Sequence, residues 1–336
     1  MNRLIIPEGY RSELGIKETQ YAIKSIKDYF ERQLAKQLNL TRVSAPLFVR
    51  PETGLNDNLN GVERPVKFGI KDLAEAEVEV VHSLAKWKRL ALKNYGFGYG
   101  EGLYTDMTAI RRDEELDNLH SIYVDQWDWE KVILKDERNI ETLKATVRSI
   151  YQALKDTEHY IADKYSCIEE WLPEDISFVT TTELENMWPG DTPKERENKI
   201  TKAKGAVFLM QIGDKMPSGE RHDGRAPDYD DWQLNGDILV DYPVLDRALE
   251  ISSMGIRVDE NSLMEQLKKA DCMDRAELPF QKAILNKELP YTVGGGIGQS
   301  RICMYVLRKA HIGEVHSSVW PDDMASEARA AGINIL

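Results

Sequence analysis

Apolar side chains recur at helical spacing in two long stretches of the chain. Between about residues 17 and 38 they recur every three or four positions, which predicts an amphipathic helix that ends at Asn39. A second helix with one apolar face is predicted to begin at about Ile140. The apolar positions are Ile23, Ile26, Phe30, Leu34 and Leu38 in the first helix, and Leu143, Val147, Ile150 and Leu154 in the second.

Shorter apolar runs elsewhere are typical of strands. An extended segment through Val43, Ala45 and Pro46 follows the first helix. The predicted strands cover residues 78–81, 121–130, 178–181, 206–212, 238–240 and 250–258. Because these strands do not alternate with helices in βαβ order, we predict an α+β fold: a mainly antiparallel β-sheet flanked by helices.

Neither an internal repeat nor a Pro/Gly/Ser-rich linker divides the 336 residues, so we predict a single domain over 1–336. The polar segment 182–204 is predicted to be a helical excursion at the surface. The last dozen residues are expected to lie against the body without carrying chemistry.

Composition narrows the class of protein. The chain is 42% hydrophobic and 30% charged, which is ordinary for a globular protein. No apolar run approaches the roughly 20 residues of a membrane span, and residues 1–8 lack the features of a signal or transit peptide. We therefore expect a cytoplasmic protein without a membrane partner. The net charge of −13, with 44 Lys and Arg, makes a nucleic-acid partner less expected.

The cysteines exclude some chemistry. Cys167, Cys272 and Cys303 are far apart and form no C-x-x-C motif, so structural zinc and thioredoxin-like redox chemistry are not expected. They are interpreted as core or surface thiols. Position 2 is Asn2, so we expect no glutamine-hydrolysing domain that uses an N-terminal cysteine nucleophile.

A lysine lies on the apolar face of a predicted short helix. Ser83 is predicted to cap this helix. Lys88 lies on the inward face, where a cation is costly unless an anion or a partner meets it. The alternative is a lysine that snorkels to water. The inward face carries Leu84, Trp87 and Ala91, and the outward face carries Lys86, Arg89 and Lys93.

The predicted strand 121–130 has two unlike faces. Alternation places Tyr123, Trp127 and Trp129 on one face, which we predict to be core. The opposite face changes from apolar to polar along its length, as a strand does when it leaves a core and enters a pocket. It carries Ile122, Val124, Gln126, Asp128 and Glu130. Asp128 beside Gln126 could bind an ammonium group; the alternative is a solvated strand end.

The predicted strand 250–258 carries charges suited to a nucleotide or a carboxylate. Gly255 interrupts it and indicates a bulge or a close backbone approach. Arg257 offers a planar fork for a carboxylate. Glu250 could ligate Mg²⁺, which usually accompanies ATP phosphates, and Asp237 is a second metal candidate.

Two further segments could contact a ligand. The glycine-rich segment 294–301 is neither a P-loop nor a dinucleotide fingerprint. It predicts a backbone close to a ligand, through Gly296 and Gly298, and then a helix with Arg301 in its first turn, which suits a nucleotide. Segment 222–232, which includes Asp230, is acidic and turn-prone; it lacks the glycine and glutamate of an EF-hand, and the alternative is an exposed turn.

Together these segments resemble the class II aminoacyl-tRNA synthetase core, and within it the ammonia-dependent asparagine synthetase family, over essentially the whole chain. The long helix with residues 40–46 resembles motif 1, residues 111–130 resemble motif 2, and 294–301 resemble motif 3. Asp-Gln-Trp-Asp-Trp-Glu and His-Ser-Leu-Ala-Lys-Trp-Lys-Arg resemble signatures of the synthetase family itself. In motif 2 the Arg-x-acid pattern fits Arg111-x-Asp113 or Arg112-x-Glu114, and the family pattern favours Arg111.

The resemblance implies activation of the aspartate β-carboxylate by ATP through β-aspartyl-AMP, followed by attack of ammonia. It implies that Arg111 and Arg301 grip the phosphates, with Mg²⁺ near Asp237 and Glu250. The implied substrate-binding residues are Ser83, Lys88, Gln126, Asp128, Ser252, Ser253 and Arg257, and the candidates for ammonium are Asp57 and Asp230.

The resemblance also implies a homodimer, because the motif 1 strand lies at a subunit interface in such proteins. A tRNA-charging enzyme is the first alternative, but no anticodon-binding barrel precedes motif 1 and the chain is acidic. A non-catalytic nucleotide sensor on the same scaffold is the second, since a fold does not determine a function. Aspartate, ammonia and ATP are therefore the expected partners.

Overall fold

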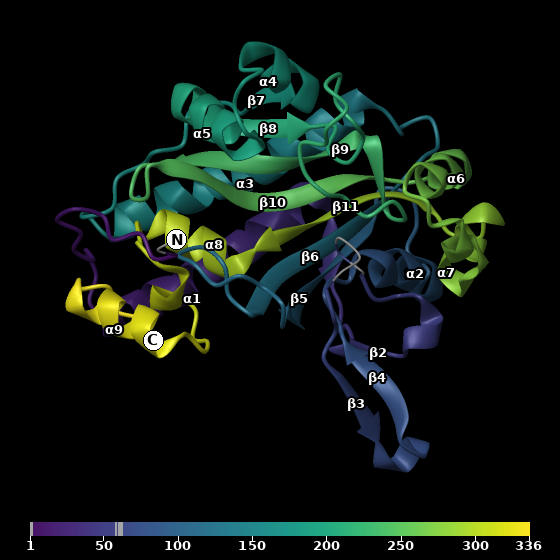
Figure 1. Cartoon of the computed structure of the whole chain (residues 1–336), viewed down its shortest axis with the longest axis horizontal. Coiled ribbons are helices and arrows are strands. Elements are labelled where there is room, and N and C mark those ends of the chain that lie inside the picture. The colour runs from purple at the N-terminus through teal and green to yellow at the C-terminus, as the bar shows by residue number, and fades with distance from the viewer. Residues whose placement is uncertain (1–2, 58, 60–62) are drawn as a thin grey trace.

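An eight-stranded sheet forms the centre of the computed structural model, which describes residues 3–57, 59 and 63–336 (Figure 1). Asn2 lies outside the described residues. The strand order is β1-β5-β6-β11-β10-β9-β8-β7. The outermost pairs, β1 with β5 and β7 with β8, are parallel, and the inner pairs are antiparallel. The predicted α+β fold with a mainly antiparallel sheet is confirmed.

The strands are β1 (Leu40–Arg42), β2 (Phe48–Val49), β3 (Lys67–Ile70), β4 (Ala76–Val80), β5 (Gly102–Ile110), β6 (Tyr123–Ile133), β7 (Ser177–Thr180), β8 (Ala206–Met210), β9 (Asp230–Tyr242), β10 (Arg247–Arg257) and β11 (Tyr291–Gly298). The helices are α1 (Ile16–Leu38), α2 (Ala85–Tyr95), α3 (Ile140–Lys164), α4 (Thr181–Met187), α5 (Pro193–Lys204), α6 (Glu260–Lys269), α7 (Pro279–Leu285), α8 (Gln299–Val306) and α9 (Asp322–Ala330). Short 3₁₀ turns cover Pro51–Thr53, Lys71–Leu73, Met273–Glu277 and Ile312–Glu314.

The main core lies between one face of the sheet and helices α1 and α3. Phe30 of α1 packs on Trp127 of β6 with ring centroids 4.7 Å apart, and Trp127 and Trp129 are fully buried. Asn39 ends α1 in the left-handed conformation (φ 58°), and its N–H bonds the Ala35 carbonyl. Because side chains alternate across a strand, the residues between these tryptophans face the other side of the sheet.

The segment 182–204, predicted to be a helical excursion at the surface, is helical. It covers α4 except for its first residue and all of α5, and the two helices begin with capping boxes at Thr180 and Thr192. Leu184 and Ile200 are buried against β8 and β9, so this segment covers one end of the sheet. Figure 1 shows α4 above β8 and α5 beside it, and a small sheet of β2, β3 and β4 that projects from the opposite side of the molecule.

Helix α2 begins two residues later than the predicted serine cap. Leu84 is its N-cap residue and makes no side-chain cap bond. Ser83 instead donates its hydroxyl hydrogen to Asp57. The predicted outward face is also wrong at two positions, because Lys86 and Arg89 are only 2% exposed. Lys86 pairs with Asp228, and Arg89 donates to backbone carbonyls of the segments that cover it.

The ends of the chain pack together. Met324 and Ala328 of α9 are buried with Leu4, so the last residues lie against the body. Among the described residues, none of the helices combines the length and the apolar character that a membrane crossing requires.

Candidate active site

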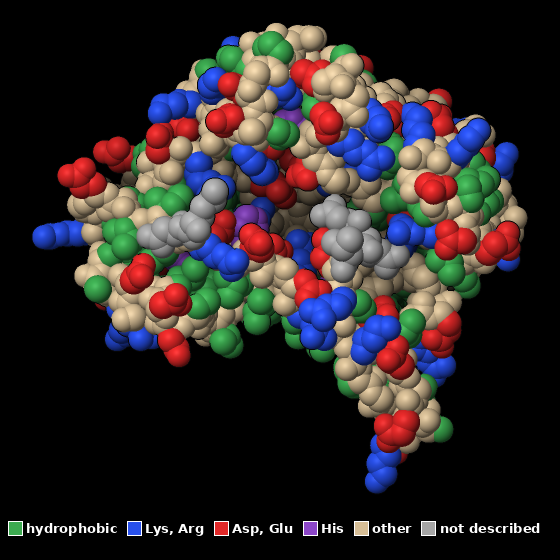
Figure 2. All heavy atoms as spheres, viewed as in Figure 1, with side chains coloured by type: hydrophobic (Ala, Val, Ile, Leu, Met, Phe, Trp, Pro, Cys, Tyr) green, Lys and Arg blue, Asp and Glu red, His purple; other side chains and the backbone are tan. Residues whose placement is uncertain are grey.

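A cavity of about 470 Å³ opens on the sheet face opposite α1 and α3. Its walls come from β6, β10 and β11, from the first turns of α2, α5 and α8, and from segment 223–230. Figure 2 shows this hollow near the middle of the molecule, with acidic and basic side chains gathered in and around it. A polar cavity of this size suits a charged small molecule.

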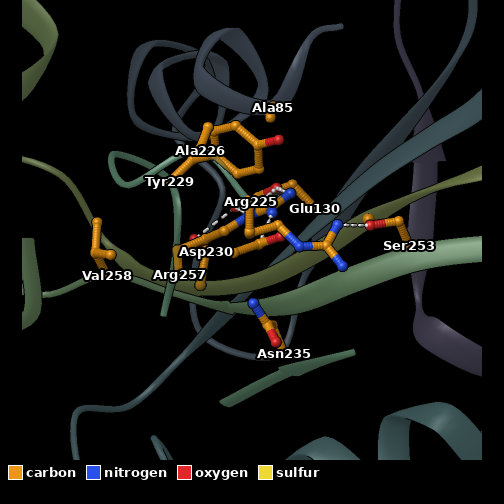
Figure 3. Close-up of polar contacts among 12 residues, drawn as sticks. Ala85, Glu130, Arg225, Ala226, Tyr229, Asp230, Asn235, Ser253, Arg257 and Val258 are labelled. Atoms are coloured by element: carbon orange, nitrogen blue, oxygen red, sulfur yellow. Dashed lines mark hydrogen bonds and ion pairs between the residues drawn. The ribbon is translucent and has the colours of Figure 1, made fainter. Parts of the chain in front are cut away.

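One end of the cavity is built around a buried arginine (Figure 3). Arg257, at the end of β10, donates from Nε and Nη2 to Glu130, with Nη2 2.7 Å from Oε2, and from Nη1 to Asp230. Glu130 also accepts the Thr292 hydroxyl at 2.6 Å. Burial opposes ionisation of Glu130, but Arg257 outweighs it and lowers the pKa of this carboxyl. These contacts use three of the five guanidinium hydrogens, which leaves one on each terminal nitrogen for a ligand carboxylate.

Lys88 is held beside this network. Its Nζ donates to Asp128 and, at 2.9 Å, to the Gly295 carbonyl, and it lies 4.0 Å from Glu130. The backbone N–H of Leu84 fixes the other Asp128 oxygen at 3.1 Å. Burial lowers the pKa of Lys88, against the raising effect of Asp128. One ammonium hydrogen remains for a substrate carboxylate, so Lys88 is an anion-binding candidate and not a lysine that snorkels to water.

Asp57 is a further buried carboxylate that lines the cavity. Asp57 accepts hydrogen bonds from the Ser83 hydroxyl at 2.8 Å and the Tyr229 hydroxyl at 3.2 Å. The N–H of Leu59 bonds its other oxygen at 2.9 Å. Burial raises the pKa of Tyr229 well above its usual value, so the phenol remains a neutral donor. Asp57 therefore has a fixed orientation beside Asp230.

Glycines of β11 make room for these side chains. β11 pairs with β6 so that Gly294 lies opposite Glu130 and Gly296 lies opposite Asp128. A Cβ on Gly294 would lie 2.0 Å from Oε2 of Glu130, and one on Gly296 would lie 2.3 Å from Oε1 of Gln126. These glycines lie in β11 and admit the side chains of β6; Gly295, Gly296 and Gly298 also line the cavity, where the predicted approach of their backbone to a ligand stays a prediction.

The other end of the cavity carries cations near a pair of carboxylates. Arg301, in the first turn of α8, lies 3.5 Å from Glu250 and donates to its backbone carbonyl at 3.1 Å. Arg111 also lines the cavity, and its buried Nε has no hydrogen-bond partner among the described residues. Arg112, the alternative in motif 2, does not line the cavity.

Arg225 connects the two strands at this end. It donates to the Ser253 hydroxyl and, at 2.7 Å, to Asp237, and its own buried Nε has no partner in the described part of the chain. Burial raises the pKa of Asp237 to about 6, against the lowering effect of Arg225, and the nearby Glu250 carboxylate adds to the rise. Asp237 and Glu250 are thus close enough to repel each other, and a shared cation would relieve that repulsion.

The structure brings most of the predicted site residues to this one cavity. Those that line it are Asp57, Ser83, Lys88, Arg111, Gln126, Asp128, Asp230, Glu250, Ser253, Arg257, Gly296, Gly298 and Arg301. Two predicted residues do not line it. Ser252 is buried and donates to the Gly296 carbonyl, because a bulge between Glu250 and Ser252 shifts the alternation of β10. The Asp237 carboxylate does not line the cavity itself but accepts a hydrogen bond from Arg225, which does.

Many lining residues were not singled out from the sequence, and three of them are Arg225, Tyr229 and Lys194. Arg225 and Tyr229 lie in segment 222–232, for which an exposed turn was the alternative, and that alternative is wrong because Asp228, Asp230 and Asp231 are buried. The single arginine among four aspartates was the available signal. Nothing in the sequence pattern points to the third, Lys194 of α5.

Comparison with known proteins finds similar proteins that match this chain over its whole length. The family model described as aspartate-ammonia ligase matches residues 17–332. The chain is 67% identical to the aspartate–ammonia ligase of Ruminiclostridium cellulolyticum over 336 residues, which are 100% of both chains. It is 66% identical to that of Clostridium tetani over 334 residues, 99% of this chain and 98% of the other.

Solved structures resemble the fold at low sequence identity. The asparaginyl-tRNA synthetase of Pyrococcus horikoshii, complexed with asparaginyl-adenylate, has a TM-score of 0.66 at 14% identity over 90% of this chain and 70% of that chain. The asparaginyl-tRNA synthetase of Entamoeba histolytica has a TM-score of 0.63 at 14% identity over 90% of this chain, which spans only 66% of the synthetase. At this identity the likeness concerns the fold, which is that of the class II synthetase catalytic core. The full-length matches decide the family: this chain belongs to the aspartate–ammonia ligase family.

Proposed function

We propose that this cavity makes asparagine from aspartate and ammonia by way of a β-aspartyl-adenylate. Membership of the family supplies the overall ligase activity and the use of ATP. The observation that carries the proposed route is the division of the cavity into two charged ends. One end holds a fixed network around Arg257 and Lys88, and the other holds Arg301 beside Glu250. Two further lining arginines, Arg111 and Arg225, have buried donors that lack partners among the described residues.

Arg257 and Lys88 are suited to hold the carboxylates of aspartate. Each is fixed by protein carboxylates and keeps hydrogens for a ligand. Gln126 and Asp128 border the same space and are suited to orient the α-amino group. This arrangement presents the β-carboxylate toward the cations at the other end, and a fixed orientation lowers the barrier to reaction.

Arg111 and Arg301 would stabilise the negative charge that develops on the α-phosphate when the β-carboxylate attacks it. The carboxylate oxygen forms a bond to phosphorus, and pyrophosphate leaves with the electrons of the broken P–O bond. Ammonia then attacks the acyl carbon, and AMP leaves. Asp57 and Asp230, which lie at the acyl end, are our candidates for binding ammonium and accepting its proton.

Asp237 and Glu250 fit a magnesium ion that is shared with phosphate oxygens. Among the described residues no group of three or more metal-ligating side chains exists. Magnesium in ATP sites is commonly bound by one or two carboxylates together with phosphate oxygens and water, so a pair is sufficient. Bound there, the ion would neutralise phosphate charge; Glu250 would orient it directly, and Arg225 would hold Asp237 in place.

We also propose a homodimer. β1 is the first strand in the sheet order, so one of its edges faces away from the sheet and is available for a subunit contact. Light scattering of the purified protein should give twice the chain mass of 38.4 kDa. A monomeric mass at working concentration would refute this assignment.

The route is tested by the products. The protein is incubated with ATP, magnesium, aspartate and ammonium, and asparagine and nucleotides are quantified by chromatography. One AMP should form for each asparagine. ADP in place of AMP would refute the adenylate route while leaving the ligase activity intact.

Arg301→Ala tests the phosphate end. Loss of one charge-stabilising donor should lower kcat by about 10²–10³-fold, with the thermal midpoint unchanged because the side chain is partly exposed. Arg148→Ala, which removes an exposed arginine on α3, is the matched control. Near-normal turnover of Arg301→Ala would remove this residue from the site.

A further inference from the structure

Helix α5 brings a cation to the rim of the cavity. Lys194, the second residue of α5, lines the cavity together with Asp223, Arg225, Glu250 and Arg301. The helix belongs to segment 182–204, which is remote in sequence from the synthetase-like motifs. Its packing on β9 and β10 places its first turn above the Glu250 end of β10.

The ammonium group of Lys194 is charged and reachable. Its Nζ lies 2.9 Å from Oε2 of Glu197, one turn further along α5, and its side chain is 64% exposed. Partial burial opposes the charge, but Glu197, Glu250 and Asp223 outweigh it and raise the pKa of Lys194. The contact with Glu197 uses one of three ammonium hydrogens, so the others can bind an anion.

Glu197 also links Lys194 to the segment that carries Arg225. Its Oε1 lies 3.0 Å from Nε2 of His222, and both side chains are buried. Arg225 follows three residues later, and its unpartnered Nε is buried in the wall of the same cavity. The carboxylate of Glu197 therefore fixes Lys194 and, through His222, the segment that carries Arg225, and both Lys194 and Arg225 line the cavity, where two cations suit a phosphate ligand.

Position along β10 indicates which part of ATP these cations meet. Glu250 and Arg257 are separated by roughly 20 Å of strand at about 3.3 Å per residue. The aspartate end of the cavity is at Arg257, and Arg111 and Arg301 serve the α-phosphate in the proposed function. Leu119 and Ile312, which belong to the main core, give the cavity apolar lining that suits the base. Because Arg301 lies 3.5 Å from Glu250, the α-phosphate reaches this end of the cavity, and the terminal phosphates extend from it toward Lys194.

We propose that Lys194 is a substrate-binding residue that contacts the β- and γ-phosphates of ATP and therefore the pyrophosphate product. The inference rests on the proposed adenylate route, in which pyrophosphate leaves from this end. Arg225, which lines the same cavity, binds the same phosphates. Segment 182–204 thereby contributes directly to the site.

The test compares pyrophosphate with AMP, because only pyrophosphate carries the groups that Lys194 should contact. Lys194→Met keeps the side-chain length and removes the charge, and Lys194→Arg restores a donor. Lys202→Met is the matched control, because Lys202 lies on the same helix, is 69% exposed and pairs with Asp246 at 2.7 Å away from the cavity. Product inhibition is measured for both products, and magnesium pyrophosphate binding is measured by titration calorimetry.

Loss of one charge-assisted hydrogen bond should weaken pyrophosphate inhibition and binding by about tenfold or more in Lys194→Met. Inhibition by AMP and the KM for aspartate should not change, and Lys194→Arg should recover most of the loss. Unchanged pyrophosphate affinity in Lys194→Met, or an equal loss for AMP, would overturn the inference. Failure of the proposed function is distinguishable, because the wild-type protein would then release ADP and phosphate.

Discussion

Replacement of Glu130 by glutamine should destabilise the protein although Glu130 contacts no substrate in our account. The glutamine has nearly the same shape but no charge. Arg257 would keep Asp230 as a partner and lose the carboxylate that accepts from both its Nε and its Nη2. Thr292 and Lys88 would also lose their negative neighbour.

The magnitude follows from burial. Glu130 is 0% exposed and Arg257 is 2% exposed, so water cannot solvate the remaining charge. Removal of one partner from a buried ion pair typically costs about 3–5 kcal/mol. Asp230 still neutralises part of the Arg257 charge, which argues for the lower half of that range. Against a total stability of about 5–15 kcal/mol, such a loss is large.

Urea unfolding monitored by tryptophan fluorescence measures this effect, because Trp127 and Trp129 flank Asp128 on β6 and are fully buried. Asp246→Asn serves as the control, since it breaks an exposed pair with Lys202 that should be worth no more than about 1 kcal/mol. If Glu130→Gln loses no more stability than this control, the buried network does not hold the site as we describe.

Three further predictions test other parts of the account. Gly296→Ala should raise the KM for aspartate, because the new Cβ would lie 2.3 Å from Oε1 of Gln126 and displace it, whereas Gly190→Ala, with nothing within 4 Å, should be silent in steady-state kinetics. Burial lowers the pKa of His311 from 6.5 to about 4, so its contribution to stability is complete above pH 6.5 and is lost as the pH falls toward 4. In urea titrations at several pH values, the free energy of unfolding of His311→Asn should fall by about 3 kcal/mol less than that of the wild type over that range. Equal falls in the two proteins would contradict this. Glu250→Gln should raise the magnesium concentration needed for half-maximal activity, and an unchanged requirement would remove Glu250 from the metal site.

Much of the fold could be predicted because the sequence pattern reflects burial directly. The apolar stripe of α1 and the alternation in β6 correspond to the core between α1, α3 and the sheet. Gln126 and Asp128 were placed on the correct face of β6 for the same reason. Tyr123 departs from the predicted core, since this first residue of β6 is 38% exposed, lines the cavity and packs on His316.

Long-range pairing explains what the pattern could not predict. Lys86 and Arg89 occupy the outward face of an isolated helix, yet Asp228 and the segments near Pro290 cover them. Ser252 and Ser253 face opposite sides of the strand, and the bulge between Glu250 and Ser252 makes Ser253, not Ser252, share the cavity face with Glu250. Lys194 reaches the cavity because α5 packs over β10, a contact that depends on the whole fold.

The central claim is that the β-carboxylate of aspartate attacks the α-phosphate of ATP. Aspartate labelled with ¹⁸O in its β-carboxylate distinguishes this route from others, because the attacking oxygen stays on phosphorus when ammonia displaces AMP. Mass spectrometry of the products should find one labelled oxygen from aspartate in each AMP and none in pyrophosphate. AMP without label, or label in inorganic phosphate, would contradict the account.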